Sequence, residues 1–150
     1  MQEHRAIIIK EVTTFTPEIA HMIRHFVKQL DDYSQPLSDE NVKFIIESEN
    51  THLYVARLQD TQQVVGMYTL VVYRIPYKMK AQLEDLVVET AFRGQGIGTQ
   101  LLKHSVDKAK EYQVKSLNFT SRATRESANT LYQKFGFEKR DTNVYRKDLE

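Results

Sequence analysis

The segment Arg93-Gly94-Gln95-Gly96-Ile97-Gly98 has the residue types of an anion-binding loop. A strand pattern precedes the segment, and an amphipathic helix pattern follows it, with apolar residues on one face at Leu101, Leu102, Val106, Ala109 and Tyr112. In such a junction, unpaired backbone N–H groups and the positive end of the helix dipole point at one spot. Glycine allows a ligand to approach the backbone closely, so phosphate is the ligand that this pattern favours.

Two common phosphate loops do not fit this segment. A Walker loop ends in Gly-Lys-Ser/Thr, whereas Gly98 is followed by Thr99 and Gln100, so the required lysine is missing. The Rossmann fingerprint would place its third glycine at Thr99, and it opens a run of βαβ units, whereas hairpin patterns precede this loop. A structural tight turn at a strand–helix junction stays open as the alternative.

The remaining pattern is Arg93-x-x-Gly96-x-Gly98, preceded by the apolar strand Leu83-Glu84-Asp85-Leu86-Val87-Val88 and followed by Asn129-x-x-Tyr132-x-x-Phe135-Gly136-Phe137. At these residues the chain resembles the GNAT N-acetyltransferase superfamily, whose signature is Arg/Gln-x-x-Gly-x-Gly/Ala. The resemblance is most specific from about residue 82 to residue 137. It implies that acetyl-CoA is the co-substrate and that its binding residues are Leu86, Val87, Val88, Arg93, Gly94, Gln95, Gly96, Ile97, Gly98, Thr99 and Asn129.

The resemblance also implies a role for several of these groups. The strands on either side of the loop are expected to splay apart, so that the backbone of residues 86–88 pairs with the pantetheine amides. A backbone N–H near Val87 or Val88 would then polarise the thioester carbonyl. Asn129 is expected to contact the pantetheine or phosphate arm, and the Tyr132 hydroxyl to protonate the departing thiolate. On residues alone, Tyr132 also fits a core stripe of its helix.

Glu84 lies in the strand before the loop, where many relatives place an acidic residue that removes the proton of the amine. Strict alternation puts Glu84 on the face of Leu86 and Val88, and Asp85 on the face of Leu83 and Val87. A carboxylate in apolar surroundings has a raised pKa and becomes a plausible base. We therefore assign Glu84 as the candidate base, with Asp85 and solvent as alternatives.

Three further pairs of residues carry weaker signals. His21 and His25 have a spacing that can bind metal, but no third ligand accompanies them, so no metal site is expected. Arg122 and Arg125 would suit a substrate carboxylate or the 3′-phosphate of CoA, or they are exposed charges. Asp31 and Asp32 lie where relatives close over the acceptor, which suggests a cationic amine or a solvated turn.

The length of 150 residues favours a single domain over residues 1–150. Helices are expected from Thr16-Pro17 to Leu30, from Ser38 to about Glu49, after the glycine loop, and at about 124–135. Strands are expected at 6–12, 53–58, 64–74, 82–89 and 116–121, with short strands around Phe137 and Val144. A turn is expected at 75–80. Together with the GNAT resemblance, these elements imply an α/β (α+β) fold of the GNAT type, with a mixed, mostly antiparallel sheet of about seven strands flanked by about four helices.

Composition narrows the function classes. The chain has no cysteine, which excludes a cysteine nucleophile, and no Ser-His-Asp arrangement is evident, so direct transfer to an amine is expected. The net charge of +1 disfavours a nucleic-acid partner, and no apolar run is long enough for a membrane span. The amino terminus matches neither a signal nor a transit peptide, so a cytoplasmic protein is expected.

The sequence thus predicts an acetyl-CoA-dependent N-acetyltransferase that acts on a primary amine of a small molecule or peptide. A non-catalytic acyl-CoA-binding module and an acetyltransferase for protein N-termini or lysines are the alternatives. The resemblance leaves a homodimer open.

Overall fold

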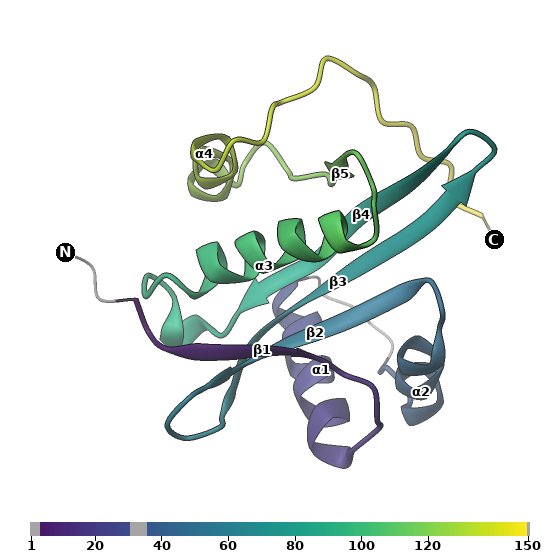
Figure 1. The fold of residues 1–150 in the computed structure, drawn as a ribbon. Helices are drawn as coiled ribbons and strands as arrows, with labels where there is room; N and C mark the ends of the chain where they lie inside the picture. The colour runs from purple at the N-terminus through teal and green to yellow at the C-terminus, as the bar shows by residue number, and fades with distance from the viewer. Residues whose placement is uncertain (1–3, 31–35, 150) are drawn as a thin grey trace. The chain divides into compact units, whose positions relative to one another are not determined.

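The computed structural model describes residues 4–30 and 36–149, and the chain divides into two compact units, Met1–Phe119 and Thr120–Glu150. The prediction of one domain over residues 1–150 stays a prediction. The elements, in chain order, are β1 (Ile7–Glu11), α1 (Pro17–Leu30), α2 (Asp39–Glu47), β2 (Thr51–Leu58), β3 (Val64–Ile75), β4 (Lys78–Val88), a 3₁₀ helix η1 (Thr90–Phe92), α3 (Ile97–Glu111), β5 (Leu117–Asn118) and, in the second unit, α4 (Glu126–Lys134) (Figure 1).

The described strands form one five-stranded sheet in the order β1-β2-β3-β4-β5. Strands β1 to β4 are antiparallel neighbours, and β5 runs parallel to β4. The predicted mixed, mostly antiparallel sheet with four helices is therefore confirmed.

The sheet has fewer strands than expected, because residues 120–149 form no strand. The short strands predicted around Phe137 and Val144 are absent from the structure. A short strand needs a paired neighbour and a face to bury, yet the side chains of Val144 and Tyr145 are 75% and 87% exposed.

The β3–β4 hairpin is longer than predicted. The ladder continues to the pair Ile75 and Lys78, so the turn consists of Pro76 and Tyr77 alone and not of residues 75–80. Strand β2 begins at Thr51, opposite Val71, and the tip of the hairpin therefore extends beyond it (Figure 1).

Helices α1 and α2 cover one face of the sheet. Ile19, Ile23 and Phe26 of α1 are buried against sheet residues that include Met67 and Val87. The predicted capping residues are confirmed: Thr16 Oγ1 accepts from Ile19 N at 3.2 Å, and Ser38 Oγ accepts from Asn41 N at 3.1 Å. The Asp31-Asp32 segment lies outside the described residues.

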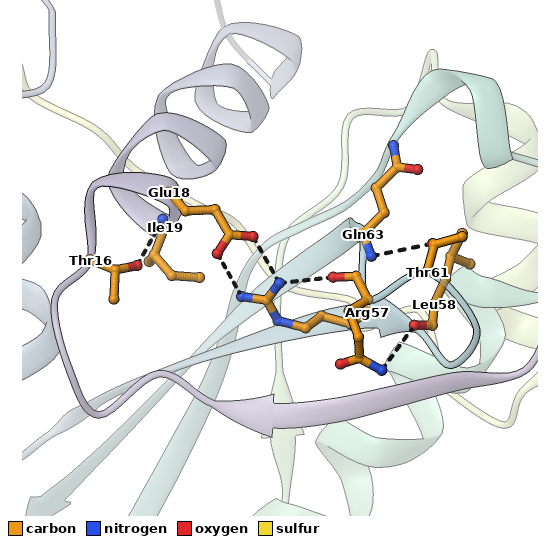
Figure 2. A network of polar contacts seen from close by, with 8 residues as sticks. Thr16, Glu18, Ile19, Arg57, Leu58, Thr61 and Gln63 are labelled. Carbon is orange, nitrogen blue, oxygen red and sulfur yellow. Dashed lines mark hydrogen bonds and ion pairs between the residues drawn. The ribbon is translucent and has the colours of Figure 1, made fainter.

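The start of α1 is tied to the β2–β3 hairpin by a network of polar contacts (Figure 2). Arg57 of β2 donates from Nη1 to Glu18 Oε1 at 2.8 Å and from Nη2 to Glu18 Oε2 at 3.4 Å. The same Nη1 donates to the Gln62 carbonyl at 2.8 Å, so one guanidinium joins the helix to the hairpin turn. The hydrogen bond from Arg57 lowers the pKa of Glu18 below its usual value.

Helix α3 covers the opposite face. Its buried stripe consists of Ile97, Leu101, Leu102, Ser105 and Ala109, and it packs on the face that carries Gly66 and Tyr68. The Tyr68 hydroxyl is 2.7 Å from His104 Nδ1, so this buried phenol has a polar partner on the helix. Because α3 begins directly after the glycine loop, this packing fixes the loop at the end of β4.

Candidate acetyl-transfer site

A β-bulge in β4 decides which way the acidic side chains point. Thr69 lies opposite Glu84, but Met67 lies opposite Val87, so β4 has one residue more than β3 between these pairs. Asp85, at the bulge, has a φ of +54°, the left-handed conformation that asparagine and aspartate tolerate better than most residues.

The bulge overturns the strict alternation expected from the sequence. Beyond it the faces exchange, so Glu84 shares its face with Val87, while Val88, opposite Gly66, lies on the α3 face. The expectation that Glu84 shares the face of Val88 is therefore wrong. An extra residue shifts the two-residue period of a strand by one, and every later side chain changes face.

The two carboxyl groups have different surroundings. Gln82 Nε2 donates to Glu84 Oε1 at 2.6 Å, which orients that carboxylate along the strand. Asp85 keeps part of its surface exposed, but burial on its other side raises the pKa of its carboxyl above the usual value. The structure therefore places Glu84 on the α1 face and Asp85 at the bulge.

Strand β4 has a free edge between β5 and the glycine loop. Among the described residues, β5 pairs with β4 only at Ala81 and Gln82, so the two strands separate after that point. Glu89 N donates to Val65 O at 2.8 Å, toward β3. Because successive N–H groups alternate in direction, the N–H of Val88 points toward the open edge. A ligand with amide groups can therefore extend the sheet along residues 83–88.

The glycine loop continues from this edge into α3. Gly94 and Gly96 have φ values of +77° and +80°, and Gly96 is the N-cap of the helix. A Cβ at Gly94 would meet no atom within 4 Å, so the space on that side of the loop is open. Arg93 Nε donates to Val88 O at 3.1 Å and joins the loop to the strand. The predicted order of strand, glycine loop and helix N-terminus is present.

Residues 4 and 5 pass along the same loop, a feature that the sequence analysis did not predict. Arg5 N donates to Gln95 O at 3.2 Å, and Gln100 Nε2 donates to Arg5 O at 2.9 Å. A Cβ at Gly96 would lie 2.0 Å from His4 Nδ1. A substitution at Gly96 would therefore displace the His4 side chain, so Gly94 is the better position at which to probe the open side of the loop.

Gly66 of β3 was also missed, although a lone glycine in a strand pattern signals a bulge or a close approach. A Cβ there would lie 2.9 Å from Val87 O and 3.0 Å from Leu101 Cδ1. Only glycine lets β3, β4 and α3 approach this closely.

His25 of α1 contacts Glu89, the residue that follows β4. Its Nε2 lies 2.5 Å from Glu89 Oε2, and Gln29 Nε2 donates to the same oxygen at 3.2 Å. Among residues 4–30 and 36–149, no three histidine, aspartate or glutamate side chains gather as a metal site. The contact between His25 and Glu89 joins α1 to the end of β4 beside the glycine loop.

The second unit contains Asn129 and Tyr132 on α4. Asn129 Nδ2 donates to the Arg122 carbonyl at 3.0 Å, which closes the turn before the helix. Burial raises the pKa of the Tyr132 hydroxyl, and the nearby Arg125 guanidinium lowers it to a smaller extent. The phenol therefore keeps its proton at neutral pH.

Comparison with known proteins decides the family. The family model described as the acetyltransferase (GNAT) family matches residues 19–137, which is most of the chain. The chain belongs to the GNAT acetyltransferase family. GNAT enzymes transfer an acetyl group from acetyl-CoA, and the glycine loop and the free edge of β4 both lie within the matched residues.

Solved structures with the same GNAT fold cover nearly the whole chain. An aminoglycoside acetyltransferase from an uncultured soil metagenomic sample, in complex with sisomicin, is 21% identical with a TM-score of 0.82, covering 96% of this chain and 97% of its own. A transcriptional regulator from Bacillus halodurans C-125 is 24% identical with a TM-score of 0.79, covering 95% and 100%. A ribosomal-protein-alanine N-acetyltransferase from Brucella melitensis biovar Abortus 2308 is 18% identical with a TM-score of 0.76, covering 97% and 100%.

At these identities the solved structures establish the fold of this GNAT chain and not its acceptor. A comparison with the curated proteins found no match. Within the part of the chain that the structure describes, no helix is both long and apolar enough to cross a membrane.

Proposed function

We propose that this protein is an acetyl-CoA-dependent N-acetyltransferase whose acceptor is a primary amine. The observation that carries the proposal is the continuity of the free β4 edge with the glycine loop. The N–H of Val88 faces the open edge and is available to an amide, and the loop that follows offers N–H groups at the start of α3. This arrangement fits a ligand that carries amides along one stretch and phosphates at the next.

The binding residues follow from this arrangement. The loop, Arg93 to Gly98 with Thr99 in the first turn of α3, would hold the pyrophosphate, and the edge of β4 would hold the pantetheine arm. Acetyl-CoA, when bound, supplies the acetyl group as a thioester. A backbone N–H near Val87 or Val88 would donate to the thioester carbonyl oxygen and stabilise the negative charge that develops there.

Two proton transfers complete the proposed reaction. The amine nitrogen bonds to the carbonyl carbon, the carbon–sulfur bond breaks, the amine loses a proton and the sulfur gains one. Glu84 is our candidate for the proton acceptor, because its carboxylate lies on β4 beside the bulge. Tyr132 is our candidate for the proton donor, a role that its protonated hydroxyl supports. Because the chain has no cysteine, we expect direct transfer and not a cysteinyl acyl-enzyme.

A panel of amines tests the proposal. Release of CoA from acetyl-CoA is measured with monoamines, polyamines, an aminoglycoside and peptides with free N-termini, each against a reaction without acceptor. We expect at least one amine to accelerate CoA release, and mass spectrometry to find the acetyl group on that amine. Tight CoA binding with no acceleration by any amine would instead favour a non-catalytic acyl-CoA-binding module.

A further inference from the structure

One face of the β3–β4 hairpin carries paired polar side chains that the proposed reaction does not explain. The register joins four cross-strand pairs on this face, Thr69 with Glu84, Val71 with Gln82, Tyr73 with Lys80 and Ile75 with Lys78. We refer to these eight residues as the hairpin ledge. The ledge begins beside Met67 and Val87, which are buried in the α1 core, and runs outward to the tip of the hairpin (Figure 1).

The two faces of this hairpin differ in burial. On the α3 face, Leu70, Val72, Ala81 and Leu83 are all buried. On the ledge every side chain is half-buried except that of Lys78, which is exposed. The ledge is therefore a sheet surface that the described parts of α1 and α2 leave partly open, and six of its eight side chains carry hydrogen-bonding groups.

The negative and positive charges on the ledge lie at opposite ends of it. Glu84 stands at the inner end, and Lys80 and Lys78 follow four and six residues toward the tip. Residues 72–83 contain no acidic side chain. At roughly 3.3 Å per residue, the Glu84 and Lys80 positions are about 13 Å apart along the strand.

The charged groups are held at these positions. The Lys80 Nζ lies 5.6 Å from the centre of the Tyr73 ring, directly across the hairpin, so it does not lean along the strand toward Glu84. The Glu84 carboxylate accepts from Gln82. The ledge therefore presents a negative group and a positive group that are separated by the length of about four extended residues.

We propose that the hairpin ledge binds the acceptor and that the acceptor is the N-terminal segment of an extended peptide with an acidic side chain near its fourth residue. This inference rests on the proposed function, because the peptide amine would meet Glu84 beside the bulge. The acidic side chain would then reach Lys80 and Lys78. A compact amine whose anionic group is only a few bonds away cannot reach from Glu84 to Lys80. A polycation would be repelled by the two lysines.

The experiment uses three alanine hexapeptides with a free amine and an amidated carboxyl end, which differ only in glutamate, glutamine or lysine at the fourth position. KM for each peptide is measured at saturating acetyl-CoA, and peptide binding to the CoA-loaded protein is measured by calorimetry. We expect the glutamate peptide to have a KM and a dissociation constant about two- to fivefold below those of the glutamine peptide, the range of a partly exposed ion pair. We expect the lysine peptide to bind most weakly.

Matched variants assign this preference to the ledge. The double variant Lys78→Ala, Lys80→Ala should bring the glutamate and glutamine peptides to equal KM, with kcat and the KM for acetyl-CoA unchanged. The control is Arg74→Ala, which removes one positive charge from the opposite face of the same hairpin and should keep the preference. Roughly 0.5 M salt should reduce the preference in the unaltered protein, because it shortens the screening length.

Equal loss of the preference in Arg74→Ala and in the lysine double variant would overturn the proposal, because the effect would then come from net charge. A glutamate peptide that binds no more tightly than the glutamine peptide would also overturn it. Acetylation of small amines with no peptide binding would refute the ledge and leave the proposed function standing. Peptide binding with the predicted preference, but without acetyl transfer to any amine, would support the ledge and refute the proposed function.

Discussion

Replacing Gly66 by alanine tests how β4 and the glycine loop are positioned. The added Cβ would lie 2.9 Å from the carbonyl oxygen of Val87, a backbone atom that cannot rotate away. Overpacking of this kind costs about 1–3 kcal/mol, and the reduced freedom of the unfolded chain offsets about 0.4–1 kcal/mol of it. We expect a net loss of about 1–2 kcal/mol, or roughly 2–8 °C in Tm for a chain of this size.

Gly98→Ala is the matched control. Gly98 lies in the first turn of α3, and its Cβ would be 3.7 Å from Val88 Cγ2, an ordinary contact. Alanine is the better helix former, so this variant should gain up to about 1 kcal/mol. Urea and thermal unfolding would measure both variants, and calorimetry with CoA should show weaker binding in Gly66→Ala. A Gly66→Ala protein as stable as the unaltered chain would refute the close approach that we infer.

Other variants test the site. Gly94→Asn keeps the left-handed conformation accessible and adds bulk on the open side of the loop, so calorimetry should show CoA affinity reduced by more than about tenfold, a loss above 1.4 kcal/mol. Tyr132→Phe should lower kcat by about 10²–10⁴-fold with CoA affinity retained, and activity within about threefold would exclude it as proton donor. Glu84→Gln should lower kcat/KM near neutral pH and move the rising limb of the pH–rate profile upward; the same shift in Asp85→Asn alone would make Asp85 the base. Burial raises the folded-state pKa of Asp85, so its carboxyl destabilises the fold as the pH rises through that pKa. In unfolding experiments Asp85→Asn should therefore be more stable than the parent at neutral pH. This difference in stability should disappear below about pH 3.8.

The sequence predicts the parts of the fold that local patterns determine. The caps at Thr16 and Ser38, the apolar stripe of α1 and the strand–glycine–helix order around Gly96 are local signals, and the structure contains each of them. The residues around the glycine loop also resemble the GNAT superfamily, and the family match confirms this resemblance.

The remaining features depend on contacts between distant segments. The bulge at Asp85 arises from the pairing of β4 with β3, and the residue pattern of β4 itself does not mark it. The passage of Arg5 along Gln95 joins residues 90 positions apart, which periodicity cannot reveal. The hairpin ledge became visible only when the register placed Tyr73 opposite Lys80.

Transfer of a labelled acetyl group tests the central claim most directly. The protein is mixed with acetyl-CoA that carries the label in its acetyl group, with and without an amine acceptor, and the label is followed in the amine, the protein and the remaining thioester. We predict that the label moves to the amine only when the acceptor is present, that CoA appears in equal amount, and that the protein stays unlabelled. Label on the protein would contradict direct transfer, and label retained on the thioester with every amine would contradict acetyl transfer itself.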